Sequence, residues 1–292
     1  MNVVSAMSQI VRIIPRLDIK GPNLVKGIHL EGLRVLGKPA EFAQYYYEQG
    51  ADELLYLDVV ASLYERNSLD DFISKTAKTI FIPLTVGGGI RTIADIKRVL
   101  RAGADKVSLN TAAIRHPQII ARAATIFGSS TISVSIEASR QPDGEYLAYT
   151  DNGREQTGKE VIAWAKEVAR LGAGEILVTS IDREGTGAGY DQELTKQVAD
   201  AVSIPVVAMG GAGKLADIKN IITQSHASAV SLASMLHYDF INHHQFNFDD
   251  DRAEGNIEFL RKGMQFSKIA PVTLGEIKKY LTKNGIACRF LP

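Results

Sequence analysis

Two stretches of the sequence repeat each other: LTVGGGIRTIADIK at Leu84–Lys97 and VVAMGGAGKLADIK at Val206–Lys219. The same shift of 122 residues aligns GADELL, which starts at Gly50, with GAGEIL, which starts at Gly172. Repetition at a fixed spacing indicates structural units that occur more than once. The chain is therefore predicted to consist of two similar halves.

Short apolar runs rich in β-branched residues recur through both halves and predict strands. The runs are continuous rather than alternating, as expected for parallel strands that are buried on both faces. Segments with helical periodicity, such as Thr92–Arg101 and Gly158–Leu171, separate most of them. The eight predicted strands are Val11–Leu17, Glu53–Asp58, Ile80–Val86, Lys106–Asn110, Thr131–Ile136, Glu175–Thr179, Pro205–Met209 and Ala229–Leu232.

Eight strand–helix units predict an α/β fold, a (β/α)₈ TIM barrel with a two-fold half-barrel repeat. The alternative, an open doubly wound sheet, is disfavoured by the repeat. A single barrel domain is expected over residues 1–292, with a loose N-terminal tail at 1–9 and an insertion at 238–271 between strand eight and the last helix. Active sites of such barrels lie on the loops that follow the strands.

The balance of charge limits the function classes. The chain has 33 basic and 33 acidic residues, so it lacks the broad electrostatic attraction of proteins that bind nucleic acid or membrane surfaces. We therefore expect neither partner. The single cysteine, Cys288, excludes an internal disulfide and a multi-thiolate zinc site, and with no long apolar run it favours a cytoplasmic protein.

Glycine-rich turns between a strand and a helix can place backbone N–H groups and a helix dipole around a phosphate. The repeat supplies two such turns, which we call the first and second glycine sites. One turn alone could simply be a tight turn, but two related turns at one barrel mouth suggest a long ligand with a phosphate at each end. The first site comprises Gly87, Gly88, Gly89, Asn110 and Thr111, and the second comprises Gly210, Gly211, Gly213, Ala233 and Ser234.

Two carboxylates occupy related positions at strand ends, Asp18 in RLDIK and Glu137 in SIEAS. Proton transfer to and from a substrate needs an acid and a base on either side of it, and this pair is the candidate. Helix capping or ion pairing is the structural alternative for each. Further candidates for substrate contact are Thr179, which ends the sixth predicted strand, and Glu184 and Gly185, which follow it. An ordinary polar loop is the alternative explanation for Glu184 and Gly185.

Charged residues also begin several predicted strands. Because burial of unpaired charge is costly, those that face inward should pair into a ring that closes the bottom of the barrel. The alternative is a set of surface charges beside the strands. The members of this candidate ring are Arg12, Glu53, Lys106 and Glu175.

No histidine has a catalytic position in the pattern. His237, His243 and His244, with the acidic run at 249–251, lack tight ligand spacing, so no metal site and no cofactor are predicted. Trp164 and the aromatic run Tyr45–Tyr47 lie in helical patterns and are interpreted as packing residues.

The sequence strongly resembles the cyclase subunit family of imidazole glycerol phosphate synthase, an enzyme of histidine biosynthesis. The resemblance runs from about Arg12 to Arg289, interrupted by the 238–271 segment. The matching motifs, in order, are RIIPRLDIK, LVKG, PLTVGGGIR, GADKVSLNTAA, GAGEILVTSIDREGT, GYD, GGAGK and YLTKNGI.

The resemblance implies that a partner glutaminase docks at the barrel bottom and releases ammonia, which passes through the core to a bisphosphorylated ribonucleotide at the mouth. It implies that Asp18 is a general acid/base, that Lys26 lies over the substrate, and that the glycine sites hold its phosphates. The four-charge ring would be the ammonia gate, and Asp105 would face the glutaminase. The products would be imidazole glycerol phosphate and an aminoimidazole carboxamide ribonucleotide.

Three residues depart from the family pattern. Glu137 and Glu184 each stand where the family has aspartate, and Arg16 stands where it usually has cysteine. The extra methylene of a glutamate moves its carboxylate by roughly an ångström, a displacement that can cost on the order of a hundredfold in rate.

In these departures the sequence resembles a paralogous branch of the family, which is found with bacterial surface-polysaccharide genes. That branch is thought to pass ammonia to a sugar-amidating enzyme, which would be a second partner. The leading expectation is imidazole glycerol phosphate formation, and the alternative is an ammonia conduit for sugar amidation. The sister isomerase of the same pathway is a third possibility, disfavoured by the LVKG and NTAA motifs and by the charge set.

Overall fold

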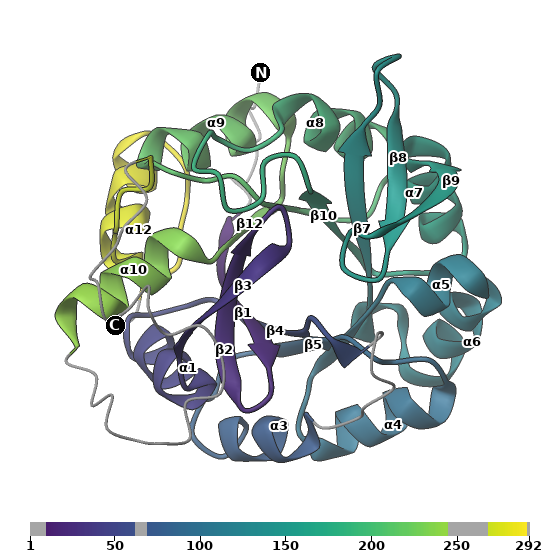
Figure 1. Ribbon diagram of the computed structural model, residues 1–292, viewed down its shortest axis with the longest axis horizontal. Coiled ribbons are helices and arrows are strands. Elements are labelled where there is room, and N and C mark those ends of the chain that lie inside the picture. Colours follow the sequence, from purple (N-terminus) through teal and green to yellow (C-terminus); the bar gives the residue numbers. More distant parts are fainter. Residues whose placement is uncertain (1–9, 62–68, 245–267, 291–292) are drawn as a thin grey trace, which may run out of the picture.

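A computed structural model describes residues 10–61, 69–244 and 268–290. Eight parallel strands form a closed barrel in the order β1, β4, β5, β6, β7, β10, β11, β12, with β12 pairing back to β1 (Figure 1). The predicted (β/α)₈ TIM barrel is confirmed. The barrel strands are β1 (Arg12–Lys20), β4 (Leu54–Asp58), β5 (Leu84–Gly87), β6 (Lys106–Leu109), β7 (Ile132–Arg140), β10 (Glu175–Ser180), β11 (Val206–Met209) and β12 (Ala229–Leu232).

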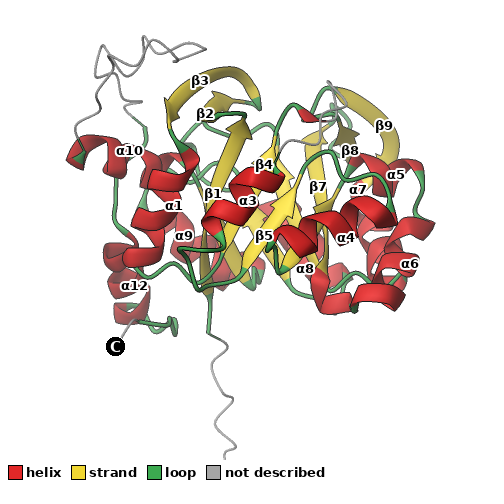
Figure 2. Cartoon of the chain, turned by 90° about the horizontal axis from the view of Figure 1, so that it is seen from below, coloured by secondary structure: helices red, strands yellow, loops and turns green. Residues whose placement is uncertain are grey.

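All eight predicted strands correspond to barrel strands, although the third begins at Leu84 and not at Ile80. Helices cover the outside of the barrel on every side (Figures 1 and 2). They are α1 (Pro39–Glu48), α3 (Asp70–Thr76), α4 (Ile93–Ala102), α5 (Thr111–Arg115), α6 (Gln118–Phe127), α7 (Val161–Arg170), α8 (Gln192–Ala201), α9 (Leu215–Ser225), α10 (Ser234–His243) and α12 (Leu274–Lys283), with a short 3₁₀ turn at Ser129–Thr131.

Two antiparallel hairpins extend the sheet at the mouth and were not predicted from the sequence. The strands β2 (Asn23–Ile28) and β3 (Glu31–Gly37) follow β1, and β8 (Tyr146–Thr150) and β9 (Glu155–Glu160) follow β7. Figure 2 shows both hairpins at the same end of the barrel. Because β1 and β7 are the first strands of the two halves, the hairpins are equivalent parts of the repeat.

The apolar core has two parts. The larger lies between the strands and the helices and contains Trp164, Tyr46 and Phe42, with Tyr45 and Tyr47 packed against it. This confirms the packing role predicted for these aromatic residues. The smaller part consists of alternate residues on neighbouring strands, whose side chains fill the barrel interior: Ile14, Leu55, Leu177, Val207, Met209 and Ala229.

The two ends of the barrel sequence lie together. The Val11 amide donates to the Ala287 carbonyl at 3.0 Å, and the buried Lys278 of α12 donates to the Gly50 carbonyl and to Asp52, each at 2.7 Å. Closure of the barrel therefore involves the C-terminal helix as well as the β12–β1 pairing.

The predicted insertion at 238–271 differs in the structure, because helix α10 continues to His243. The rest of that segment from 245 to 267, like the predicted tail at 1–9, lies outside the described residues. Across the ranges that the structure describes, none of the helices combines the length and apolar character needed to cross a membrane.

Candidate functional site

The strand register places Asp18 and Glu137 at equivalent positions of the two halves. Asp18 lies opposite Leu57 of β4, and Glu137 lies opposite Thr179 of β10. Leu57 and Thr179 are related by the shift of 122 residues that relates the two glycine sites. Since β1 and β7 are four strands apart in the eight-strand order, the two carboxylates come from opposite sides of the mouth (Figure 1).

The first glycine site opens into a cavity of about 390 Å³. Gly88 and Gly89 have φ of 95° and 69°, and a Cβ on Gly88 would lie 2.3 Å from the Asp58 carbonyl oxygen, so only glycine fits there. Asn110 and Thr111 also line this cavity, and Glu137 reaches it from β7. The structure thus brings the predicted first site and one of the predicted carboxylates together.

The second glycine site has a similar backbone, with positive φ at both glycines. Gly210 and Gly211 have φ of 86° and 110°. The residue before the following helix also matches, with φ −124° and ψ −81° at Ala233 against −127° and −89° at Asn110. Yet the space in front of this turn is only about 20 Å³. It is lined by side chains that include Arg16, Lys26, Glu184 and Ser234, with Gly185 beside them.

A buried cluster of charges fills that space. The Arg16 Nε donates to Asp18 Oδ1 at 2.6 Å, and its Nη1 lies 3.5 Å from Glu184 Oε2. Lys26 forms an ion pair with the other oxygen of Glu184. These four side chains are at most 5% exposed. Burial alone would raise the pKa of Glu184, but the positive charges of Lys26 and Arg16 outweigh it and lower that pKa to about 2.

Glu137 has a different environment. Its Oε2 accepts a hydrogen bond from the Gly153 amide at 2.8 Å, in the turn between β8 and β9. Burial in the cavity wall raises the pKa of Glu137 to about 7, although the Gly153 hydrogen bond and the charge of Arg16 act in the opposite direction. A carboxyl group with this pKa is present in both protonation states near neutral pH.

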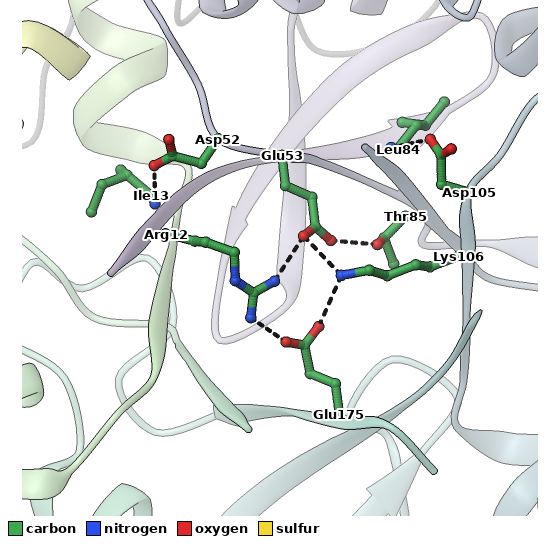
Figure 3. A network of polar contacts seen from close by, with 9 residues as sticks. All are labelled: Arg12, Ile13, Asp52, Glu53, Leu84, Thr85, Asp105, Lys106 and Glu175. Atoms are coloured by element: carbon green, nitrogen blue, oxygen red, sulfur yellow. Dashed lines mark hydrogen bonds and ion pairs between the residues drawn. The ribbon is translucent and has the colours of Figure 1, made fainter. Parts of the chain in front are cut away.

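The four charges at the other end of the barrel meet in a ring, as Figure 3 shows. Arg12 bridges the two carboxylates, with 2.8 Å to Glu53 Oε2 and a close contact to Glu175. Lys106 lies 2.9 Å from Glu53 Oε2 and 3.6 Å from Glu175 Oε2. The Thr85 hydroxyl donates to the remaining oxygen of Glu53 at 2.5 Å. The ring is therefore held by alternating charges from four strands or strand starts.

Acidic residues next to the ring fix the backbone around it (Figure 3). Asp52 Oδ2 accepts from the Ile13 amide at 2.8 Å, and its other oxygen binds Lys278. Asp105 Oδ2 accepts from the Leu84 amide at 2.9 Å while its side chain stays exposed at the barrel bottom. Asp105, expected to face a partner, thus also anchors a strand beside the ring.

Comparison with known proteins identifies the family. Residues 12–242 match the family described as Histidine biosynthesis protein. A protein of Legionella pneumophila named "Imidazole glycerol phosphate synthase subunit HisF" is 59% identical over 205 residues, which are 70% of this chain and 97% of the relative. The chain belongs to the HisF family.

Two further HisF relatives cover most of the barrel. The protein of Alkaliphilus metalliredigens strain QYMF is 46% identical over 231 residues, 79% of this chain and 92% of the relative. That of Thermosynechococcus vestitus is 50% identical over 232 residues, 78% of this chain and 83% of the relative. The resemblance noted in the sequence is confirmed, and most of the chain shares it.

Several polar residues in the cavity of this HisF family member were missed by sequence reasoning. Arg91, Arg115 and His116 line the first site, together with Asp151 and Asn152. Arg115 lies 3.2 Å from Asp151. The run Asp151, Asn152, Gly153 is a turn signal, and all three residues have positive φ, so it could have indicated the second hairpin.

Two histidines of this HisF family member each lie beside one aspartate, His226 at 2.8 Å from Asp200 and His243 at 3.3 Å from Asp239. Within 10–61, 69–244 and 268–290, no three His, Cys, Asp or Glu side chains could together hold a metal ion. His237 is fully buried, and its Nδ1 lies 2.6 Å from the Tyr46 hydroxyl. Burial and the charges of Lys26 and Arg16 lower the pKa of His237 to about 3, so it packs as a neutral ring. The acidic run at 249–251 lies outside the described residues.

Proposed function

We propose that this chain is the cyclase subunit of imidazole glycerol phosphate synthase. It uses ammonia from a glutaminase partner to convert a bisphosphorylated ribonucleotide into imidazole glycerol phosphate and an aminoimidazole carboxamide ribonucleotide. Membership of the HisF family supports the proposal. Its substrate-binding and catalytic residues would be those at the barrel mouth, and its partner would bind at the opposite end.

The observation that carries the proposal is the placement of two carboxylates between two glycine turns. Asp18 stands on β1 beside the second site, and Glu137 stands on β7 beside the first. A substrate that extends from one glycine site to the other would pass between these side chains. Groups on both sides of a reacting centre are what stepwise proton transfer requires.

The two carboxylates are suited to different tasks. Asp18 is held in place by its contact with Arg16 Nε at 2.6 Å. Glu137, whose pKa is about 7, can both give and take a proton at neutral pH. We assign general acid/base catalysis to the pair.

The charge ring supports an ammonia gate at the barrel bottom. It closes the end of the barrel opposite the mouth, and Arg12 and Lys106 remain partly exposed, at 27% and 21%. A small neutral molecule could pass only if the pairs between these residues and the two glutamates separate. A glutaminase docked beside Asp105 would deliver ammonia to this point.

The test supplies ammonium ions and the bisphosphorylated ribonucleotide to the purified chain and follows imidazole glycerol phosphate. We expect turnover that Asp18→Asn abolishes and that Glu137→Asp retains or raises. Absence of turnover in both the natural chain and Glu137→Asp, under conditions in which another HisF protein is active, would contradict the proposal.

The relatives described above carry the histidine-pathway name, so sugar amidation is not part of this proposal. The sugar-amidating partner and the cytoplasmic location stay predictions from the sequence.

A further inference from the structure

The two glycine sites have similar backbones but very different free space. About 390 Å³ is open at the first site and about 20 Å³ at the second. The smaller volume holds about one water molecule, so a phosphate group, which is larger, does not fit beside the side chains as they stand. Something occupies the position where the second site would hold an anion.

The occupant is the carboxylate of Glu184. Its Oε2 would lie 2.9 Å from a Cβ on Gly210, so the carboxylate packs directly against the glycine turn. Both cations that line the space, Lys26 and Arg16, are paired with it. Glu184 therefore has the surroundings that an anionic ligand would have at this site: a glycine turn on one side and two buried cations on the other.

The backbone reinforces this placement. The His29 amide, in the turn between β2 and β3, donates to the Glu184 carbonyl at 2.9 Å. A Cβ on Gly185 would lie 2.5 Å from the Gly27 carbonyl oxygen, so the loop after β10 and the β2–β3 hairpin are in close contact. Glu184 and Lys26 are thus presented to each other by two segments that pack together.

We propose that Glu184 determines which ligands the second glycine site binds, because its carboxylate occupies the position of the anion. A ligand phosphate binds there only if it replaces Glu184 as the partner of Lys26 and Arg16. The proposal rests on the proposed function in one respect, that the mouth receives a phosphorylated ligand. It deepens that function by giving the two sites unequal roles. The first site binds a phosphate without competition, and the second binds only a group that displaces Glu184.

The test uses the full chain labelled with ¹⁵N-glycine and titrates inorganic phosphate. The amide signals of Gly88 and Gly89 report the first site, and those of Gly210 and Gly211 report the second. In the natural chain we expect the second pair to respond at a phosphate concentration at least about tenfold higher, as displacement of a charge-assisted pair requires. Equal midpoints, or no response at either pair, would overturn the proposal.

Glu184→Gln removes the competing charge with little change of shape. We expect it to lower the midpoint of Gly210 and Gly211 by about tenfold or more, because Lys26 then has no paired carboxylate and Arg16 keeps only its pair with Asp18. The midpoint of Gly88 and Gly89 should stay within about twofold, since electrostatic coupling between separated sites is weak. An unchanged second midpoint would sink the idea.

Glu184→Asp provides a second variant that keeps the buried charge if Glu184→Gln fails to fold. Its shorter side chain withdraws from Gly210, so the second midpoint should fall between those of the natural chain and Glu184→Gln. A midpoint equal to or above that of the natural chain would count against the proposal. Glu145→Gln, on an exposed turn, is the matched control and should change neither midpoint. Because no turnover is measured, a failure of cyclase activity would refute the proposed function alone.

Discussion

Gly88 and Gly210 have the same kind of backbone, with φ of 95° and 86°, yet one faces an open cavity and the other a filled one. The position two residues before each of the carboxylates Asp18 and Glu137 explains much of the difference. On β7 it is Ser135, a small residue that lines the open cavity, and on β1 it is Arg16, whose side chain helps fill the second site. The repeat therefore preserves the glycine turn, while single side chains decide whether the space in front of it is open.

The same comparison applies to the two glutamates. Glu137 lies on the wall of the open cavity, and burial raises its pKa to about 7. Glu184 lies between Lys26 and Arg16, which lower its pKa to about 2 against the effect of burial. Burial raises the pKa of both glutamates, and only in the filled site do the neighbouring cations outweigh this effect and lower the pKa.

The largest expected effect comes from Arg16→Ser, which gives the second site the residue found in the first. The substitution leaves Asp18 and Glu184 buried without a shared cation. Since breaking a buried ion pair leaves uncompensated charge, we expect the free energy of unfolding at pH 7 to fall by about 3–5 kcal/mol. Urea denaturation measures this. Ser135→Ala is the control. An equal loss of unfolding free energy in both variants would show that Arg16 does not stabilise the fold through its ion pairs.

Glu137→Gln should reduce ammonia-dependent turnover by at least about a hundredfold, the usual range for loss of a general acid/base. In the natural chain, titration of Glu137 should make the rate change with pH near 7. The remaining activity of the variant should lack this change. Initial rates measured from about pH 5.5 to about pH 9, in steps of roughly half a pH unit, test this expected pH dependence. Glu145→Gln serves as the exposed control. A variant that keeps both the rate and the limb would remove Glu137 from the mechanism.

The raised pKa of Glu137 also predicts how stability depends on pH. Its folded pKa of about 7 is above the ordinary glutamate value of 4.5, so the folded state binds the proton more tightly. Stability from this group is complete below about pH 4.5 and is lost as pH rises through about 7. Between these limits the natural chain should lose about 1–2 kcal/mol relative to Glu137→Gln, a value reduced because the residue keeps some contact with solvent. If the free energy of unfolding depended on pH in the same way in the natural chain and in Glu137→Gln, the raised pKa of Glu137 would be contradicted.

Lys106→Ala tests the charge ring, to which the first half contributes Arg12, Glu53 and Lys106 and the second half only Glu175. With the glutaminase partner present, we expect glutamine-dependent activity to fall by about tenfold, the scale of one lost charge-assisted contact. Activity driven by added ammonium ions should change much less, because the mouth is untouched. Lys196→Ala, on the exposed surface, is the control. Equal losses in the two assays would argue against a gate.

Sequence reasoning predicted the barrel because its evidence is local: each strand is a short apolar run, and the repeat relates the runs to one another. It also selected the four ring residues, since each stands at or directly before the first residue of a strand. The structure brings them together, and their role as a gate stays a prediction.

The contents of the second site could not be predicted in the same way. Arg16, Lys26 and Glu184 come from three different segments, and nothing in the spacing of those segments indicates that the side chains meet. The two hairpins were missed for a related reason, because their strands are short and polar residues interrupt them. Only the Asp151–Gly153 turn gave a local signal.

The hydrogen bond between Val11 and Ala287 has a consequence for how such a barrel can be encoded. It places the start of the first strand beside the segment after the last helix, so the eight units form a ring in space without a marked beginning. The order of the two halves along the gene is then not a requirement of the fold. A circular permutant, joined at these ends and opened between the halves near Gly128, would present the same mouth and the same ring of charges.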